Sequence, residues 1–502
     1  MLKSAREYRE SPRPVTIYST LGGTKVALDP LDQSAKSPKV LMYVCGLTPQ
    51  DRAHLGHGLM AMRFDIVRRY LMYRGLDVFF LQNVTDIDDK IIAKVLATGV
   101  DPLKMTREYS DEFYQNLKKL HVLEVNKLTR VTEFVPQIVA FVERLIEKGF
   151  AYATPEGNVY FDVAKKADYG KLSNQNVAML LESVRKEVER DKRSPADFAL
   201  WKRDNSTSLS FESPWGVGRP GWHIECSVMI YEALGELIDI HGGAVDLKFP
   251  HHENEIAQSE AHSGHGFASI WMHCGLLNID GQKMSKSLNN FIPLGEAIDR
   301  YGVNPLRFAA ARSHYRSSLD LSNKLMRDSI NSLLEFHRLF DRVRTDELDL
   351  SAKAASDSDC LRLIEDFEAA MDSDFNSSEA IVALERAKSA LIQEVDKIAP
   401  GADIPEGITT RVWVLRELGN ILGAFFDPLA VVETEGLRLA AASYGATALT
   451  PEEVRALTQQ RVEARAAKDF ARSDELRKQL SAHGVEALDS RSGSSWRFRT
   501  GD

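Results

Sequence analysis

One strand–helix–strand segment constrains the fold of this chain more than any other feature. Residues 39–44 form a short apolar run that ends at Cys45-Gly46, residues 55–74 repeat apolar side chains at helical spacing, and a second apolar run spans Asp77–Val84. Strand, helix and strand in this order predict a parallel βαβ unit, whose ligand binds beyond the carboxyl ends of the strands. We therefore expect an α/β fold with residues 45–57 at a ligand-binding edge.

The rest of the chain adds an interruption and a helical part. Residues 105–188 are mostly helical in pattern and interrupt the α/β rhythm, which resumes at residues 238–240 and 270–274. Further on, residues 321–344 and 361–391 repeat apolar side chains at three and four positions, as helices of a bundle do. We therefore expect a Rossmann-like parallel-sheet domain with an inserted domain, followed by a C-terminal helical bundle and a small terminal domain.

These patterns also set the expected domain boundaries. Small and polar residues gather at 350–358, 400–410 and 432–450, which we interpret as linkers. The expected parts are an N-terminal extension at 1–38, the parallel-sheet domain at 39–320 with its insertion at about 105–215, the bundle at 321–431, a linker at 432–450 and a terminal domain at 451–502.

Composition excludes several classes of protein. The 502 residues are 44% hydrophobic and 27% charged, as in an ordinary globular protein, and no apolar run approaches the ~20 residues needed to cross a bilayer. The first residues mix basic and acidic side chains without an apolar core, which argues against a secretory signal and a mitochondrial presequence. Four cysteines are too few for a disulfide framework and fit a reducing compartment. We therefore expect a cytoplasmic protein that does not enter a membrane.

Charge is distributed unevenly along the chain. The formal net charge is −9, but residues 451–502 carry ten Lys and Arg against nine Asp and Glu, a net of +1 that leaves −10 elsewhere. In one helix, four basic residues of this segment would form a stripe able to meet phosphates: Arg461, Arg465, Lys468 and Arg472. Acidic residues interleave with them, so a solvated helical surface is the alternative interpretation.

Two short motifs carry groups suited to phosphate chemistry. In His54-Leu55-Gly56-His57, at the start of the long helix, free N–H groups and the helix dipole favour an anion, so His54 and His57 could hold phosphate oxygens. A polar helix cap is the alternative. Far downstream, in Lys283-Met284-Ser285-Lys286-Ser287, Lys283 and Lys286 could neutralise a reacting triphosphate, the alternative being a solvated basic turn.

Four further residues are candidate metal ligands. Cys45 ends the first strand, Cys226 closes Gly221-Trp222-His223-Ile224-Glu225-Cys226, and Pro250 opens a helix that carries His251 and Glu255 on one face. Two thiolates, an imidazole and a carboxylate are a chemically suitable set for zinc. Buried structural cysteines and a capping histidine are the commoner fates of such residues, so the spacing leaves both interpretations open.

The motifs together resemble a known family. The histidine and lysine motifs resemble the two signatures of class I aminoacyl-tRNA synthetases, with Leu55 where Ile is common. Further blocks resemble cysteinyl-tRNA synthetases, from about residue 39 to residue 496. These blocks are Cys45-Gly46, Asn83-Val84-Thr85-Asp86-Ile87-Asp88-Asp89-Lys90, residues 219–227, His241-Gly242-Gly243, residues 250–255, Ser373-Asp374-Phe375-Asn376 and Lys468-Asp469-Phe470-Ala471.

The resemblance implies roles for individual residues. It implies that Cys45, Cys226, His251 and Glu255 hold one zinc ion per chain, and that His54, His57, Lys283 and Lys286 act in catalysis. It further implies that Gly46, Thr85, Trp222 and His223 line a cysteine pocket, and that Gly243, Asp246 and Lys286 meet ATP. Leu47, Pro49, Gln50, Leu59 and Ala244 differ from the family's usual residues without removing a ligand.

The implied reaction joins L-cysteine to tRNA(Cys). The carboxylate of cysteine attacks the α-phosphorus of ATP, which is bound with magnesium, and a ribose hydroxyl of the tRNA 3' end then attacks the adenylate. Residues 451–502 would recognise the tRNA anticodon, and we expect a monomer. Two alternatives remain: a cysteine ligase that transfers the adenylate to an amino sugar in thiol-cofactor synthesis, and a non-catalytic tRNA-binding paralogue.

Overall fold

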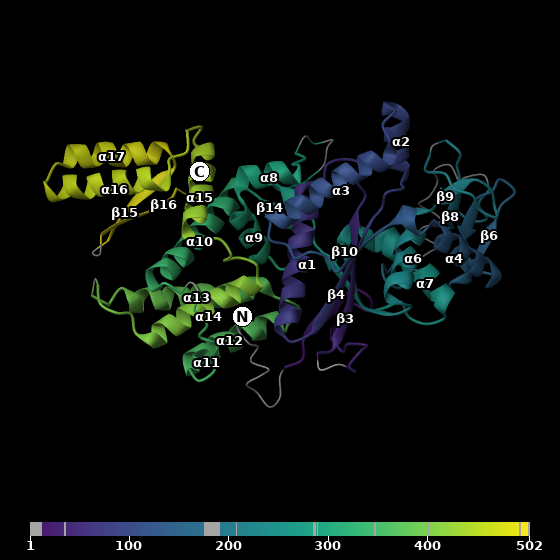
Figure 1. Cartoon of the computed structure of the whole chain (residues 1–502), viewed down its shortest axis with the longest axis horizontal. Coiled ribbons are helices and arrows are strands. Elements are labelled where there is room, and N and C mark those ends of the chain that lie inside the picture. Colours follow the sequence, from purple (N-terminus) through teal and green to yellow (C-terminus); the bar gives the residue numbers. More distant parts are fainter. Residues whose placement is uncertain are drawn as a thin grey trace.

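A parallel five-stranded sheet forms the centre of the computed structural model (Figure 1). Its order is β11-β10-β3-β4-β5, and each neighbouring pair is parallel. The strands are β3 Lys39–Leu47, β4 Asp77–Val84, β5 Lys127–Arg130, β10 Ile238–Ala244 and β11 Ala268–Cys274. The structure describes residues 13–34, 37–174, 191–206, 208–284, 288, 290–345, 348–399, 401–490 and 493–499.

Helices cover both faces of this sheet because successive side chains of a strand point to opposite sides. Met42 and Val44 of β3 pack in one core with Phe64 of helix α1 (Leu55–Tyr73). Tyr43 and Cys45 pack in another core with helices α6 (Trp222–Leu234) and α7 (Glu253–Ser263). This arrangement confirms the predicted βαβ unit and the Rossmann-like fold.

The order of the strands creates a crevice at one edge of the sheet. From β3 the chain runs outward through α1 to β4 and then, by way of α2 (Asp89–Thr98) and α3 (Pro102–Lys119), to β5. It later returns to the other side of β3 as β10 and β11. Ligands of open α/β sheets bind where the direction of winding reverses, here beyond the carboxyl ends of β3 and β10.

The insertion differs from the expectation of a mostly helical segment at residues 105–188. Helices α3 and α4 (Val135–Glu147) are present, but β5 still belongs to the central sheet, so 105 is too early for the start of an insertion. After α4 comes a four-stranded antiparallel sheet of order β6-β7-β8-β9. Its strands are Ala151–Ala153, Val159–Phe161, Phe198–Arg203 and Gly218–Pro220. Strands of three to six residues are too short to show a clear period in sequence, which explains the error. Residues 175–190 lie outside the described part.

Beyond the central sheet the chain passes through a small sheet into helices. The small sheet has the order β13-β12-β14, with strands Gln282–Lys283, Leu277–Ile279 and Leu319–Leu321. Helices α8 (Leu294–Tyr301) and α9 (Val303–Ala311) precede β14. The predicted helical bundle is confirmed and consists of α10 Asn323–Val343, α11 Ser351–Ala354, α12 Ser358–Met371, α13 Ser377–Val395, α14 Glu406–Ile421 and α15 Leu429–Ser443.

The linker expected at residues 432–450 is wrong for most of its length. Helix α15 occupies it as far as Ser443 and packs against α10. The small residues that suggested a linker are packing residues: Ala440 is fully buried, and a Cβ on Gly436 would lie 2.2 Å from the ring of Phe498. Small side chains let a helix approach its neighbours closely, which composition alone does not distinguish from a flexible segment.

The terminal part is a helix pair with a hairpin, at the end of the molecule opposite to the inserted sheet (Figure 1). It contains α16 Pro451–Ala466, α17 Phe470–Ala482, β15 Val485–Ser490 and β16 Gly493–Phe498. The hairpin is bound to α10: the Phe498 N–H donates to Asn331 Oδ1 (2.8 Å), and Arg338 donates to the Trp496 carbonyl oxygen (2.7 Å).

The expected single basic stripe on this segment is wrong. Helix α16 ends at Ala466, and Lys468 adopts a left-handed conformation (φ 59°) that turns the chain into α17. Arg461 and Arg472 therefore lie on different helices, and Arg461 is only 5% exposed. A spacing of three and four residues predicts one face only while the helix continues.

The N-terminal residues tie these parts together. Strands β1 (Thr16–Ser19) and β2 (Thr24–Ala27) form a hairpin. The Thr20 N–H donates to the Trp271 carbonyl of the central sheet (2.8 Å), and the Thr16 N–H donates to the Asp372 carbonyl of the bundle (2.8 Å). In the part of the chain that the structure describes, no helix has the length and apolar character to cross a membrane.

Candidate active site

A cavity of about 400 Å³ opens at the carboxyl ends of β3 and β10, where the fold predicts a ligand. It brings together nine of the residues proposed from the sequence: Cys45, Gly46, His54, His57, Thr85, Trp222, Cys226, Asp246 and His251. Glu255, His223 and Gly243 do not line it. Lys283 belongs to β13, and Lys286 lies outside the described residues.

The four candidate metal ligands converge at the floor of this cavity. One atom from each of Cys45, Cys226, His251 and Glu255 lies within 4.8 Å of all the others, and all four residues are buried. Cys226 Sγ is 3.5 Å and Glu255 Oε1 is 3.0 Å from His251 Nε2, and Cys45 Sγ is 3.8 Å from Glu255 Oε1. Ligands of tetrahedral zinc, at bond lengths of 2.0–2.3 Å, are about 3.3–3.8 Å apart, so two of these three distances match zinc and the third is slightly shorter.

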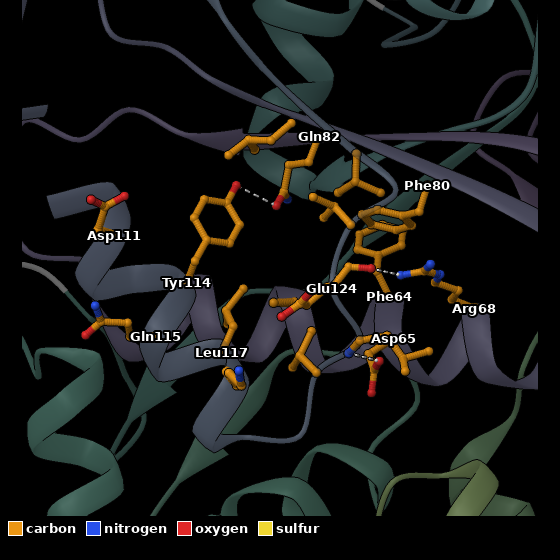
Figure 2. Close-up of a pocket in the computed structure, with 17 residues that line it drawn as sticks. Phe64, Asp65, Arg68, Phe80, Gln82, Asp111, Tyr114, Gln115, Leu117 and Glu124 are labelled. Carbon is orange, nitrogen blue, oxygen red and sulfur yellow. Dashed lines mark hydrogen bonds between the residues drawn. The ribbon is translucent and has the colours of Figure 1, made fainter. Parts of the chain in front are cut away.

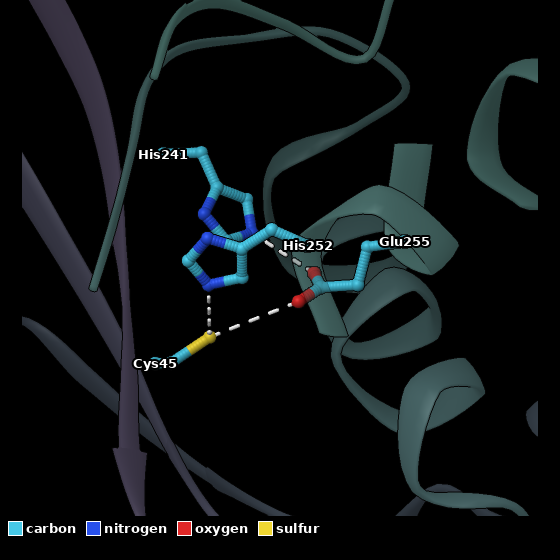
Figure 3. Close-up of side chains that lie close together, drawn as sticks. All are labelled: Cys45, His241, His252 and Glu255. Atoms are coloured by element: carbon cyan, nitrogen blue, oxygen red, sulfur yellow. Dashed lines mark hydrogen bonds and ion pairs between the residues drawn. The ribbon is translucent and has the colours of Figure 1, made fainter. Parts of the chain in front are cut away.

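A second set shares two of these ligands. Cys45, His241, His252 and Glu255 are equally close together (Figure 3). Cys45 Sγ is 3.2 Å from His252 Nε2, and His241 Nε2 is 2.9 Å from Glu255 Oε2. Because His241 and His252 do not line the cavity, a metal held by this set would be closed off from a substrate. The set that contains Cys226 and His251 borders the open space, as a catalytic zinc site requires.

The four candidate ligands of the first set shift one another's pKa values. A hydrogen bond from the Cys45 thiol lowers the pKa of Cys226 to about 6, although burial opposes this, and burial raises the pKa of Cys45. Burial also disfavours charge on Glu255 and His251. Nevertheless, the two neighbouring imidazoles lower the pKa of Glu255 to about 2, and Glu255 and Cys226 raise the pKa of His251 to about 10. Without a metal, the floor therefore presents anionic sulfur on Cys226 and anionic oxygen on Glu255 at neutral pH, and a metal ion would displace the protons of Cys45 and His251.

Gly46 allows strands β3 and β4 to meet beside this floor. A Cβ at this position would lie 1.7 Å from the Asn83 carbonyl oxygen, so no other residue fits without movement. Asn83 Oδ1 accepts hydrogen bonds from the Gly46 N–H (2.7 Å) and the Tyr43 hydroxyl (2.9 Å), and its Nδ2 donates to Thr85 Oγ1 (3.0 Å). Asn83 thus positions two residues of the predicted cysteine pocket, a role that sequence reasoning missed.

Trp222 and His223 begin helix α6 at the other side of the floor. The Trp222 ring stacks on His251 with centroids 4.3 Å apart and remains 39% exposed, so it can contact a substrate. His223 instead contacts His251, with their Nδ1 atoms 2.9 Å apart, and burial lowers its pKa. In this structure His223 orients a metal-ligand candidate and does not line the cavity.

The two histidines of the first motif cap helix α1. His54 Nδ1 accepts from the Gly56 N–H (3.1 Å), His57 Nδ1 accepts from the His54 N–H (3.2 Å), and the rings stack 3.8 Å apart. Since Nδ1 accepts in both rings, the proton of each neutral ring lies on Nε2. Burial and the neighbouring ring lower the pKa of His57 to about 3, so His57 is a neutral donor. The two histidines therefore cap the helix. The same cap bonds leave Nε2–H of each ring as a donor, which is the group that phosphate binding would require.

The remaining wall of the cavity contains one of the two residues expected to meet adenosine. Asp246 follows β10 and lines the cavity, as do residues 274–277, Met284 and Phe291. Gly243 lies one layer deeper, where a Cβ would come within 2.8 Å of the His252 ring. Sequence reasoning also missed His252 and His241, although the pair His251-His252 and the motif that begins with His241 are visible in the sequence.

Comparisons with known proteins agree with this architecture. The family model described as tRNA synthetases class I (C) catalytic domain matches residues 31–331, and the cysteinyl-tRNA ligase anticodon binding domain matches residues 447–497. Among solved structures, the methionyl-tRNA synthetase of Mycobacterium tuberculosis has a TM-score of 0.55 at 16% identity and covers 82% of this chain and 94% of its own. A ternary complex of LeuRS with tRNA from Agrobacterium radiobacter has a TM-score of 0.57 at 11% identity, over 82% and 86%. Fold and site define a class I aminoacyl-tRNA synthetase.

Curated relatives define the family within that class. A cysteine--tRNA ligase of Pseudomonas putida is 41% identical over 484 residues, which is 96% of this chain and 99% of the relative. The cysteine--tRNA ligase of Hahella chejuensis is 39% identical over 482 residues, with the same coverage. The chain belongs to the cysteine--tRNA ligase family, and it is a ligase.

Proposed function

We propose that this protein activates L-cysteine with ATP and transfers it to the 3' end of tRNA(Cys), with one zinc ion held by Cys45, Cys226, His251 and Glu255. The observation that carries this proposal is the convergence of these four buried donors at the floor of the cavity. Their mixed sulfur, nitrogen and oxygen donors suit zinc, and three of them border the space where a small amino acid would lie.

Zinc would supply a bond that a thiolate makes well and a serine hydroxyl makes poorly, which explains selection for cysteine. Residues of the chain complete the pocket. Trp222 offers an apolar face, and Gly46, held by Asn83, leaves room beside it. Thr85 contributes a hydroxyl that already accepts a hydrogen bond from Asn83. A hydrophobic pocket alone discriminates poorly between near-isosteric side chains.

The second part of the cavity would bind ATP with magnesium. His54 and His57, at the N-terminal end of α1, would donate Nε2–H hydrogen bonds to phosphate oxygens, and Lys286 with Lys283 would add positive charge as the triphosphate reorganises. Gly243 and Asp246 would define the adenosine side. The cysteine carboxylate then attacks the α-phosphorus, and pyrophosphate leaves.

The terminal helix pair would bind the anticodon end of the tRNA. Phe470, at the start of α17, is 65% exposed, which is unusual for an aromatic side chain and suits stacking against an unpaired base. The match of residues 447–497 to an anticodon binding domain supports this role. It also disfavours an amino-sugar ligase, which needs no such domain. We infer a monomer in the cytoplasm, where the free cysteines Cys45, Cys226, Cys274 and Cys360 would stay reduced.

Two measurements on one preparation test the proposal. Cysteine-dependent ATP–pyrophosphate exchange and charging of unmodified tRNA(Cys) transcript are both expected, together with one zinc per chain. Exchange without charging, but with transfer to an amino sugar, would favour the amino-sugar ligase. Absence of both reactions would favour a non-catalytic paralogue. Cys226→Ala should lose zinc and cysteine binding, whereas Cys360→Ala, a buried cysteine of helix α12, should retain both.

A further inference from the structure

A second cavity, of about 440 Å³, lies under the central sheet beside the active site (Figure 2). One face of α1 and one face of α3 form its sides, and strands β3, β4 and β5 form its roof with Val44, Phe80, Gln82 and Leu128. It is separate from the active-site cavity, with which it shares no lining residue. Volumes of this size accommodate small organic ligands.

The walls of this second cavity are largely apolar. Figure 2 shows Tyr114 and Gln82 on one side of the space and the rings of Phe64 and Phe80 on the other. Further apolar side chains complete the lining: Val44, Ala61, Leu117, Val122, Leu123, Val125 and Leu128. Such walls favour a flat aromatic or aliphatic ligand.

Two donors in the lining lack a partner among the described residues: Arg68 Nε and the carboxamide nitrogen of Gln82. The Tyr114 hydroxyl donates to Gln82 Oε1 (3.0 Å), but among the residues that the structure describes nothing accepts from the Gln82 carboxamide nitrogen. Arg68 Nε is fully buried, whereas the Gln82 nitrogen is accessible from the cavity that Gln82 lines. A ligand that carries a carbonyl oxygen would supply an acceptor for this accessible Gln82 donor.

The charged groups around the cavity do not select a charged ligand. The deep carboxylate, Asp65, already accepts from Arg69 (2.8 Å), Arg307 (2.6 Å) and the Leu123 N–H (2.9 Å). Arg68 also lines the cavity, and its guanidinium donates to the Glu124 carbonyl oxygen (2.6 Å) and to Asn126 Oδ1 (2.8 Å). Exposed side chains of both signs, from Asp111, Lys118 and Glu124, complete the charged part of the lining. The lining therefore favours a neutral molecule.

The second cavity shares a structural wall with the cysteine pocket. Val44 and Gln82 immediately precede Cys45 and Asn83 in their strands. Gln82 Cγ lies only 2.9 Å from the place where a Cβ on Gly46 would stand, so the Gln82 side chain packs against Gly46. Because Asn83 also holds Gly46, any movement of Gln82 is transmitted to the pocket in which cysteine would bind.

We propose that the second cavity is a binding site for a neutral aromatic molecule with a carbonyl acceptor, such as an aryl ketone or aryl amide. The carbonyl oxygen accepts from the Gln82 carboxamide, and the aromatic ring lies between Tyr114 and the rings of Phe64 and Phe80. Occupation displaces the Gln82–Asn83–Gly46 contact and weakens binding of cysteine, so the site is inhibitory. The inhibitory part rests on the proposed cysteine site, whereas binding itself does not.

Binding is tested first, by ¹⁹F NMR titration of the full-length protein with 4-fluoroacetophenone. We expect saturable binding with a Kd of about 1 mM, at least fivefold tighter than 1-ethyl-4-fluorobenzene, which lacks the acceptor, and 4-fluorobenzoate, which is charged. Ala61→Phe should abolish binding by filling the space, and Gln82→Leu should remove the preference for the ketone. Absence of saturation, or equal binding of all three compounds, would overturn the inference.

A measurement on the unmodified chain covers the case in which a variant fails to fold. Nuclear Overhauser effects from the ligand should reach methyl groups of Val122, Val125 and Leu128. Their absence, with saturable binding, would place the ligand elsewhere and overturn the assignment. These experiments need no enzymatic activity, so their failure leaves the proposed function untouched.

Coupling to cysteine is tested by reciprocity. Saturating 4-fluoroacetophenone should raise the KM for cysteine in ATP–pyrophosphate exchange at least threefold and leave the KM for ATP within twofold. Cysteine should weaken binding of the ketone by the same factor, because coupling between two sites is mutual. In Ala61→Phe the ketone should have no effect. Binding without any change in cysteine affinity would refute the inhibitory role.

Discussion

Gly46→Ala offers a direct test of how the active-site floor is built. The added Cβ would lie 1.7 Å from the Asn83 carbonyl oxygen, so β3 and β4 must separate by about 1.3 Å before the two atoms reach 3.0 Å, the shortest distance that real Cβ atoms show. The same movement stretches the 2.7 Å hydrogen bond between the Gly46 N–H and Asn83. It also displaces Cys45, the adjacent zinc-ligand candidate.

The expected loss follows from the size of this displacement. A misplacement of about 1 Å costs roughly 100-fold in rate, so kcat/KM for cysteine in ATP–pyrophosphate exchange should fall about 100-fold, with a smaller change in the KM for ATP. Overpacking should lower the free energy of unfolding by about 1–3 kcal/mol. Circular dichroism melting would detect this decrease, and the spectrum should show that the fold is retained.

A second glycine-to-alanine variant is the control for the loss of exchange activity in Gly46→Ala. In Gly407→Ala the nearest heavy atom to the new Cβ is Asp357 Oδ2 at 4.0 Å, so exchange activity should not change. If kcat/KM of Gly46→Ala in the exchange reaction lies within threefold of the unmodified protein, the reasoning is refuted. Such a result would show that β3 moves to accept the methyl group without disturbing the site. An equal loss of ATP affinity would point to general distortion.

Four further outcomes are expected. Cys226→Ala should remove zinc, measured by plasma emission spectrometry, and raise the KM for cysteine far more than that for ATP, whereas equal losses would indicate a structural metal. His57→Ala should lower kcat of exchange about 10²- to 10³-fold with smaller changes in KM, and a higher KM at constant kcat would contradict a transition-state role. Phe470→Ala should weaken tRNA binding by about 1–3 kcal/mol, seen as a higher KM for tRNA with exchange intact, and charging at the original KM would exclude stacking. Burial opposes ionisation of Asp65, but the guanidinium groups of Arg307 and Arg69 outweigh it, so the pKa of Asp65 is lowered in the folded protein. The ionised carboxylate therefore stabilises the fold above about pH 4, and this stabilisation is lost as the pH falls through the folded-state pKa. Asp65→Asn should therefore cost about 3–5 kcal/mol in urea unfolding at pH 7 and much less at pH 3, and an equal cost at both pH values would show that the ion pair is unimportant.

The spacing of apolar residues predicted the helices and strands whose burial repeats regularly along the chain. Helix α1 and its flanking strands were predicted to within a few residues, because their apolar spacing reflects burial on one or both faces. Helices α10, α12 and α13 of the bundle were predicted for the same reason. The short strands of the inserted sheet and helix α15 were not, because three to six residues show no period and small residues occur both in linkers and in tight helix packing.

The sequence by itself determined the chemistry available to this protein: a histidine motif at a helix start, a lysine motif, and two cysteines with a histidine–glutamate pair one helical turn apart. Only the tertiary structure decided which of these groups meet. It brought Cys45 and Cys226 to one cavity floor, added His241 and His252 as a second set, and created a separate apolar cavity behind Gln82. The physical reason is that these distances depend on strand order and on packing between segments far apart in the chain, about which the residues of any one segment carry no information.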